Sequence, residues 1–237
     1  MKCSPKSKKR EILTLEQAAA VFVADWENDV AKLANAVAFY TGMRAGEVAV
    51  LRFEDIGVDR LYVRHSWRSS EGLKECKNGE EREVLIPPQL RDLLVAQAKA
   101  NPWGQKMHGF VFWGLTADHP TDPKNWLKFL RHVLENIGYS EPNKITFHAW
   151  RHLWCSRMSD EIADKRVLMT SSGHKTEAML DHYAAHMEQE KALEKLRSAE
   201  EKLLLPILGF DEDESEIKNI DVKMLPEEKK NDKFDCE

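Results

Sequence analysis

Residues 61–87 limit the fold of this chain more than any other stretch, because their pattern is that of β-strands. Apolar and polar side chains alternate from Leu61 to His65, and the run "EREVLIP" follows after a Lys77-Asn78-Gly79 turn. This order predicts a β-hairpin or a small antiparallel sheet with Lys77 at its tip. Helical patterns lie on both sides of the stretch, so we expect an α+β fold that is mainly α-helical and has one small antiparallel sheet.

Signals for helix ends place the expected helices along the chain. Thr14 and Gln17 form a capping-box pattern ahead of an Ala-rich run, and the next helical run stops at Gly42. Arg44 follows directly and opens a short helical segment. We expect further helices at residues 89–100, 125–138 and 145–162, in a short run before Gly173, and at 187–210.

Length and composition indicate a globular protein. The chain has 237 residues, of which 42% are hydrophobic, and this is enough for one substantial core or two small ones. No run of about 18 apolar residues could span a membrane, and the basic N-terminus lacks the apolar stretch of a secretory signal. We therefore expect a cytoplasmic protein with no membrane partner. The four cysteines lie far apart without metal-ligand spacing, so we expect free thiols.

Charge is distributed unevenly along the chain. Residues 211–237 hold 11 acidic and 5 basic residues, a balance of −6, so the net charge of −5 leaves +1 for residues 1–210. The first ten residues are strongly basic. A nearly neutral body allows a positive cleft for nucleic acid. The acidic tail has few large apolar residues, and we expect it to be disordered.

Six side chains in four separate segments suggest chemistry on a phosphate group. Each of them alone has an ordinary structural explanation, as a surface charge, a solvated turn residue or a packed ring. Together they supply two arginines, a lysine, two histidines and a tyrosine, namely Arg44, Lys77, His148, Arg151, His174 and Tyr183.

These residue types fit the cleavage of a phosphodiester without a metal ion. Two Arg forks can hold the non-bridging oxygens, a Lys or His can protonate the departing alkoxide, and a Tyr hydroxyl can form a covalent intermediate. The set contains no clustered carboxylates that would hold magnesium. His148 and His152 are four residues apart, as zinc ligands can be, but the Glu of the H-E-x-x-H pattern is absent. We expect no metal and no cofactor.

Four sequence boxes, in this order, resemble those of the tyrosine recombinase (phage integrase) family. "TGMRAGEVAVLRFEDI" resembles its first box, T-G-x-R-x-x-E, and "FHAWRHLWCSRM" resembles its H-x-L-R-H box. "SGHKTEAMLDHYAAH" is similar to its G-H ending with Y-x-H, and "ECKNGEEREVLIPP" to the hairpin that bears its lysine. The resemblance implies a basic N-terminal segment (1–10), a tyrosine recombinase catalytic domain (11–187), a C-terminal helix or arm (188–210) and an acidic tail (211–237).

The resemblance also implies how the phosphate would be attacked and held. Tyr183 would attack a DNA phosphodiester and give a 3'-phosphotyrosyl link and a free 5'-hydroxyl. Arg44 and Arg151 would clamp the scissile phosphate, and His174 would donate to a non-bridging oxygen. Because the covalent link conserves the phosphodiester energy, a second 5'-hydroxyl could reverse the step without ATP.

The remaining implied roles concern proton transfer and support. Lys77 would contact the DNA and protonate the leaving 5'-oxygen, and Lys74 is a rival for this role. His148 would be the base or hydrogen-bond partner of the tyrosine. Glu47 and His152 would hold the arginines and the helix, and for both we favour a purely structural role.

Double-stranded DNA is the partner that the resemblance implies. Family members usually carry an N-terminal core-binding domain, whereas the resemblance here to the catalytic domain begins near residue 11, so we expect weak, salt-sensitive DNA binding from residues 1–237 alone. In the family, a C-terminal segment often docks on a neighbour to build a tetramer on DNA. Residues 188–210 are a candidate for that arm, because Leu203–Phe210 is apolar. Packing of this helix on its own chain is the open alternative.

The function that we expect is that of a site-specific DNA recombinase or integrase, an enzyme that transfers DNA strands in the integration or excision of mobile DNA. A type IB topoisomerase, which resembles it in catalytic residues but acts as a monomer, is one alternative. The Gly-His box and the segment after the tyrosine favour the recombinase. An inactive DNA-binding remnant is another alternative, and the complete set of six side chains speaks against it.

Overall fold

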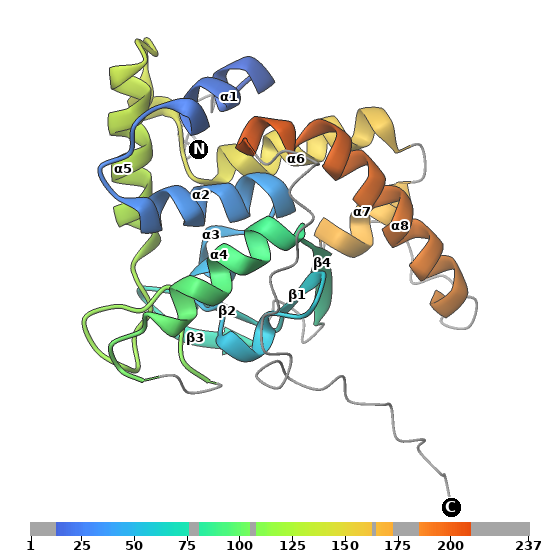
Figure 1. Cartoon of the computed structure of the whole chain (residues 1–237), viewed down its shortest axis with the longest axis horizontal. Helices are drawn as coiled ribbons and strands as arrows, with labels where there is room; N and C mark the ends of the chain where they lie inside the picture. The colour runs from blue at the N-terminus through green and yellow to red at the C-terminus, as the bar shows by residue number, and fades with distance from the viewer. Residues whose placement is uncertain (1–12, 76–80, 105–107, 163–164, 173–184, 210–237) are drawn as a thin grey trace, which may run out of the picture.

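The computed structural model describes residues 13–75, 81–104, 108–162, 165–172 and 185–209, and within these the fold is mainly helical (Figure 1). The helices are α1 (Leu15–Val23), α2 (Asp29–Thr41), α3 (Ala45–Ala49), α4 (Pro88–Lys99), α5 (Pro123–Asn136), α6 (His148–Glu161), α7 (Lys165–Ser172) and α8 (Ala185–Leu203). Three 3-10 turns are η1 (Phe53–Asp55), η2 (Pro142–Lys144) and η3 (Pro206–Leu208). The strands are β1 (Arg60–Val63), β2 (His65–Arg68), β3 (Gly72–Glu75) and β4 (Arg82–Leu85).

Local signals set the ends of the first two helices, as expected. At the start of α1, the Thr14 side chain accepts from Gln17 N at 3.2 Å and Gln17 Oε1 accepts from Thr14 N at 2.9 Å, which is a complete capping box. At the end of α2, Gly42 takes a left-handed conformation with φ +64°. That conformation ends the helix and lets the chain turn sharply into Arg44 and α3.

The strands form two separate antiparallel pairs, which differs from the single sheet that we expected. β1 pairs with β4, from Arg60 opposite Leu85 to Val63 opposite Arg82, and β2 pairs with β3. The first pair ends at Val63 opposite Arg82, and the second begins at His65 opposite Glu75.

The structure describes a hairpin turn that we did not predict from the sequence. Residues 69–71 join β2 to β3, Glu71 N donates to Arg68 O at 3.0 Å, and Gly72 follows with φ +73°. A three-residue loop closed by a left-handed glycine is a common hairpin turn, so "SSEG" is the signal that we missed in the sequence. The Lys77-Asn78-Gly79 turn that we expected lies outside the described residues.

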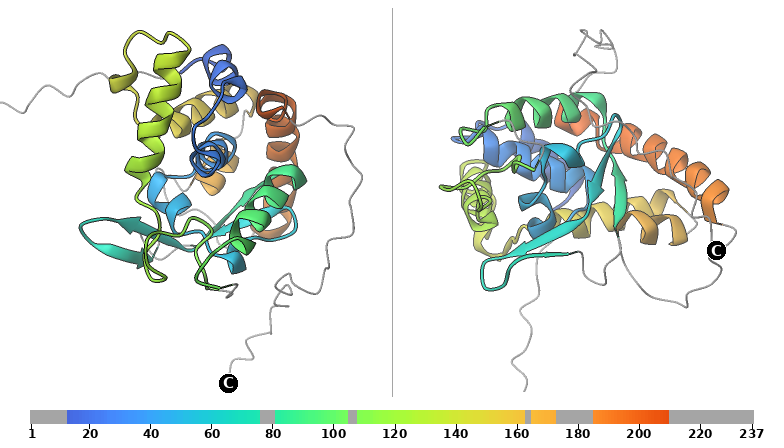
Figure 2. Two further views of the ribbon diagram at one scale, coloured as in Figure 1. Left: turned by 60° about the vertical axis from the view of Figure 1, so that its left-hand side comes forward. Right: turned by 90° about the horizontal axis from the view of Figure 1, so that it is seen from below.

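Helix α2 is the central element of the core. Nine of its 13 residues are buried, and it packs against α5 and α6. In Figure 2 (left) it runs through the middle of the molecule with the other helices around it. The rings of Phe22, Phe39 and Trp150 meet there, with centroids 5.1 to 5.6 Å apart. A polar bridge crosses this packing, because Trp150 Nε1 donates to Asn35 Oδ1 at 2.7 Å.

Helix α8 and the turn η3 pack on the chain's own helices α6, α7 and α1. Leu196, Leu204 and Leu205 are buried there. Trp154 Nε1, on α6, donates to Glu200 Oε1, on α8, at 3.1 Å. The candidate arm therefore contributes to the core of its own chain.

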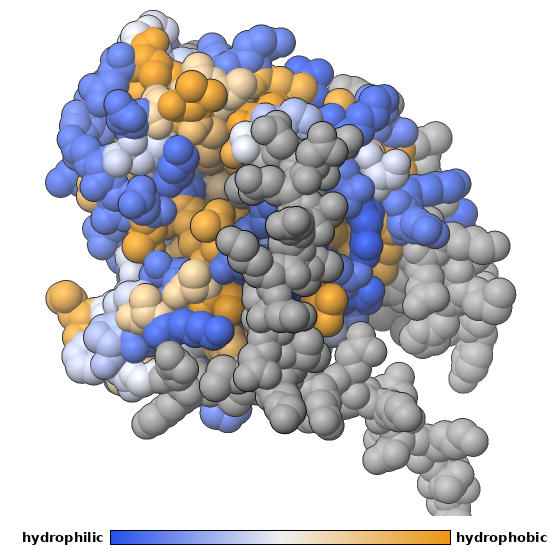
Figure 3. All heavy atoms as spheres, viewed as in Figure 1, coloured by the Kyte–Doolittle hydropathy of each residue, from blue (hydrophilic) through white to orange (hydrophobic). Residues whose placement is uncertain are grey.

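The surface of the described residues is largely hydrophilic, with apolar patches on the face shown in Figure 3. Large exposed apolar side chains are scattered over α1, β3, α4 and the loops. Such scattered exposure is ordinary for a protein surface. In the described part of the chain, no helix is both long and apolar enough to cross a bilayer.

Candidate active site

Arg44 and Glu47 are held together at the start of α3. Arg44 N donates to Glu47 Oε2 and Arg44 Nη1 donates to Glu47 Oε1, both at 2.8 Å. The three-residue spacing allows Glu47 to reach back over the first turn and cap it. Glu47 is 5% exposed, whereas the Arg44 side chain is 36% exposed. The guanidinium is therefore anchored from the protein side and still reaches solvent.

Gly46 explains how this pair comes so close to the strands. A Cβ at Gly46 would lie 2.3 Å from the carbonyl oxygen of Trp67, in β2. No side chain fits in that space, so glycine lets α3 lie directly against β2.

Arg82, at the start of β4, is a second partner of Glu47. Its Nη2 donates to Glu47 Oε2 at 2.6 Å and its Nη1 donates to Oε1 at 3.2 Å, the two-point geometry that makes an Arg–carboxylate pair strong. Its Nε donates to the carbonyl oxygen of Ser171, in α7, at 2.9 Å. The Arg82 side chain is only 9% exposed. Burial raises the pKa of Glu47, but Arg82 and Arg44 lower it further, so the pKa ends below its ordinary value and the carboxyl is ionised.

Arg151 joins these side chains from α6. It is 2% exposed, and its Nη1 donates to the carbonyl oxygen of Gly42, at the end of α2, at 2.9 Å. Burial, and then the charge of Arg44, lower the pKa of Arg151 to about 10. The side chain is still a cation at neutral pH. The charge of Arg44 thus acts on Arg151 across the space between α3 and α6.

Arg44, Arg82, Arg151 and Glu47 form what we call the arginine cluster. Three guanidinium groups and one carboxylate give these four side chains a net charge of +2. Arginine forks favour the oxygens of phosphate. The cluster is therefore suited to hold a phosphate group.

His148 and His152 lie one turn apart on α6, beside Arg151 in sequence. Their rings meet edge to face with centroids 4.7 Å apart. His148 is partly buried and His152 is exposed. Among the described residues, no group of three His, Cys, Asp or Glu side chains comes together as a metal ion would require.

Three of the predicted site residues, Lys77, His174 and Tyr183, lie outside the described residues. The rival lysine, Lys74, is on β3, where its side chain is 53% exposed and pairs with Glu71 at 3.0 Å. The described structure thus brings together Arg44, Glu47 and Arg151, with His148 and His152 on the same helix as Arg151.

Arg82 is the member of the cluster that we missed in the sequence. A signal for it exists, because Arg82 and Val84 are two residues apart on β4 and share one face of the strand. Val84 is buried and ends up in the core. An arginine on the inward face of a strand needs a buried partner, and here the partner is Glu47.

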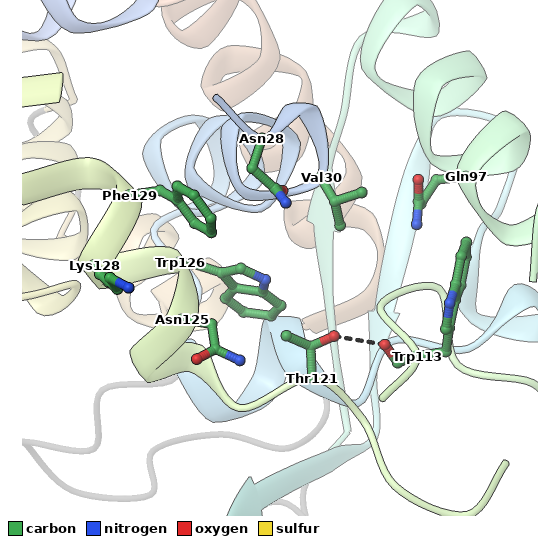
Figure 4. A pocket seen from close by; sticks show the side chains of 9 residues that line it. All are labelled: Asn28, Val30, Gln97, Trp113, Thr121, Asn125, Trp126, Lys128 and Phe129. Atoms are coloured by element: carbon green, nitrogen blue, oxygen red, sulfur yellow. Dashed lines mark hydrogen bonds between the residues drawn. The ribbon is translucent and has the colours of Figure 1, made fainter. Parts of the chain in front are cut away.

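A pocket of about 380 Å³ lies between α2, α4 and α5, and its lining contains no predicted site residue (Figure 4). Thr121 Oγ1 donates to the carbonyl oxygen of Trp113 at its rim, at 2.6 Å. The arginine cluster does not contribute to this pocket.

Residues 7–190, more than three quarters of the chain, match the model of the phage integrase family. The chain belongs to the phage integrase family. This confirms the resemblance that the four sequence boxes suggested.

One curated relative of this phage integrase family member is the tyrosine recombinase XerC of Rhodospirillum centenum (strain ATCC 51521 / SW). The two are 27% identical over 171 residues, which cover 72% of this chain and 47% of the relative. The chain therefore spans about half the length of this relative.

Solved structures of two integrases share the fold. The Tn1549 transposon integrase in complex with a circular intermediate DNA is 17% identical, with a TM-score of 0.59 over 79% of this chain and 67% of that one. The lambda integrase catalytic core is 19% identical, with a TM-score of 0.50 over 72% of this chain and 95% of that one. A lambda integrase tetramer bound to a Holliday junction is 16% identical, also with a TM-score of 0.50, over 76% of this chain and 49% of that one. These likenesses confirm the expected fold class.

Proposed function

We propose that this chain is a site-specific DNA recombinase or integrase that cuts and rejoins DNA strands without a metal ion. The observation that carries the proposal is the arginine cluster, in which Arg44 and Arg151 are held by Glu47 and by the Gly42 carbonyl. Membership of the phage integrase family and the likeness to XerC support the same reaction.

In the proposed reaction, the Tyr183 oxygen forms a bond to phosphorus and the bond from phosphorus to the 5'-oxygen breaks. His148 takes the tyrosine proton and Lys77 gives a proton to the leaving 5'-oxygen. Arg44, Arg151 and His174 stabilise the charge on the non-bridging oxygens. Reversal by another 5'-hydroxyl rejoins the strand, so no cofactor is consumed.

Covalent trapping on nicked DNA tests this proposal. A nicked strand loses a short fragment after cleavage and so traps the protein–DNA adduct, which denaturing gels detect. DNA flanking the gene and a random-duplex library would serve as substrates. We expect an adduct that forms in EDTA with the wild-type chain and is absent with Tyr183→Phe. An adduct that persists in Tyr183→Phe, or that requires a divalent metal, would contradict the proposal.

We further propose that the active assembly on double-stranded DNA is a homo-tetramer. Support comes from the lambda integrase tetramer, which shares the fold. If the whole segment 188–210 is the arm that joins neighbours, Leu204 and Leu205 must leave the core of their own chain when DNA is bound, because both are buried in it here. Multi-angle light scattering with and without a DNA site would distinguish a tetramer from the monomer that a topoisomerase-like enzyme would show.

A further inference from the structure

Arg82 connects three parts of the chain that lie far apart in sequence. Its fork binds Glu47, 35 residues away, and its Nε binds the Ser171 carbonyl, 89 residues away. Figure 1 shows β4, which carries Arg82, beside α7. Ser171 is buried in the last turn of α7, and His174 follows three residues later in the sequence.

Each of the two Glu47 carboxylate oxygens accepts one hydrogen bond from Arg82 and one from Arg44. Oε1 accepts from Arg44 Nη1 at 2.8 Å and from Arg82 Nη1 at 3.2 Å, while Oε2 accepts from Arg44 N at 2.8 Å and Arg82 Nη2 at 2.6 Å. The direction of the Glu47 carboxylate, and through it that of the Arg44 guanidinium, therefore depends on Arg82.

Stability alone is a poor explanation for this arrangement. Buried ion pairs are often no more stabilising than apolar side chains of similar size, because desolvation cancels the attraction. Their advantage is geometric, since a planar fork fixes the orientation of its partner. Arg82 also uses a third donor, Nε, to fix a carbonyl of another helix, which a single ion pair would not need.

We propose that Arg82 is a positioning residue, which holds the Arg44 guanidinium and the end of α7 in fixed relation to each other. The inference rests on the proposed function, because it assigns Arg44 to the scissile phosphate. Arg82 does not touch the phosphate in this scheme. It acts through Glu47 on Arg44, and through Ser171 on the helix that leads to His174.

The test compares Arg82→Gln and Arg82→Lys with the control Arg60→Gln. Arg60 lies on β1, in the same strand pair, and binds Glu83 at 2.7 Å and Asp59 at 2.8 Å, but it does not contact the arginine cluster. Removing either arginine costs an ion pair that begins on this strand pair, to Glu47 on α3 for Arg82 and to Glu83 on β4 for Arg60. Only the Arg82 variants remove the hydrogen bonds from Arg82 to the Glu47 carboxylate and to the Ser171 carbonyl.

Hydrogen exchange on the full chain is the first readout, and it does not need activity. We expect faster exchange of the amides of α3 and α7 in Arg82→Gln, partial recovery in Arg82→Lys, and no change in these helices in Arg60→Gln. Unchanged exchange in α3 and α7 would overturn the proposal, whether or not the chain cuts DNA. Arg82→Lys keeps the positive charge at this position. It replaces Arg82→Gln in the comparison with the wild type if Arg82→Gln does not fold.

Single-turnover cleavage of nicked DNA is the second readout. Misplacement of a clamp residue by about 1 Å costs roughly 100-fold in rate, so we expect a loss of that order in Arg82→Gln without a matching loss of DNA affinity. A methylphosphonate at the scissile position carries no charge and depends less on Arg44, so the loss should shrink on that substrate. An equal loss on both substrates would indicate general damage and overturn the proposal. A wild-type chain that forms no adduct would contradict the proposed function, and the exchange result would still decide the role of Arg82.

Discussion

Gly42 serves two purposes at a single position. Its left-handed backbone ends α2, and its carbonyl oxygen accepts from Arg151. A Cβ at this position would lie 2.8 Å from the Trp154 ring. The left-handed backbone and the lack of space for a Cβ both require glycine at position 42, whose carbonyl anchors the Arg151 guanidinium.

We therefore expect Gly42→Ala to destabilise the fold by roughly 2–4 kcal/mol, the sum of a left-handed alanine and an overpacked contact. Urea unfolding would measure it. Gly138→Ala is the control, because Gly138 has φ +79° and a Cβ added there would meet no described atom within 4 Å. The Gly138→Ala substitution should lower the free energy of unfolding by only about 1–2 kcal/mol, the cost of a left-handed alanine backbone alone. Equal costs at the two positions would mean that the Trp154 contact does not matter.

Glu200 is a carboxyl group in the core, 1% exposed. Trp154 donates to its Oε1, and Oε2 has no hydrogen-bond partner within the part of the chain that the structure describes. Burial raises the pKa of Glu200 well above its ordinary value of 4.5. The folded chain therefore keeps a proton that the unfolded chain releases, and stability falls as the pH rises above about 4.5 until the folded-state pKa is passed.

Glu200→Gln removes this titration and keeps the shape of the side chain. We expect it to raise the Tm of the chain at pH 7.5, and the gain to vanish towards pH 4.5. Calorimetry across this pH range is the measurement. A gain for Glu200→Gln that does not change with pH would show that ionisation is not its cause.

At the scale of elements, one asparagine joins α2 to α6. Asn35 is fully buried, its Oδ1 accepts from Trp150 Nε1 at 2.7 Å, and its Nδ2 donates to Ala31 O at 2.8 Å. Asn35→Ala would leave the buried indole N–H without its acceptor and open a small cavity. We expect a loss of about 1–3 kcal/mol in the free energy of unfolding, measured with urea.

Asn28→Ala is a useful comparison for that variant. Asn28 caps the start of the same helix, where its side chain accepts from Ala31 N at 2.7 Å, but it is partly exposed. Loss of the cap should cost about 1 kcal/mol. If Asn35→Ala costs no more than Asn28→Ala, the bridge between α2 and α6 contributes little to the packing.

Element ends were predictable wherever the signal lies within a few residues. The Thr14–Gln17 capping box and the glycine stop at Gly42 are found where the sequence put them. The strand pairing was not predictable in the same way. β2 turns into β3 at residues 69–71, whereas β1 pairs with the distant β4, because pairing is decided by which strands meet across the whole stretch.

At the scale of the whole molecule, α8 and η3 complete the core. Leu196, Leu204 and Leu205 are buried against other parts of the same chain. Deletion of residues 188–237 should therefore abolish the cooperative thermal transition or lower its Tm strongly, since it uncovers this apolar surface. Deletion of residues 211–237 alone, the tail expected to be disordered, should leave the Tm unchanged.

Differential scanning calorimetry of the two truncated chains, each without DNA, checks this prediction. A chain cut at residue 187 that unfolds like the full chain would mean that α8 serves only a neighbour. A Tm that falls with the shorter deletion would mean that the acidic tail has a structural role.

The sequence alone determined the family, the class of fold and the positions of the helices, because motif spacing, periodicity and caps act over a few residues. The tertiary structure decided which side chains share a partner. Arg82 meets Glu47 across 35 residues, Trp154 meets Glu200 across 46, and Arg151 meets Gly42 across 109. Such contacts depend on how whole elements pack, and no local pattern encodes them.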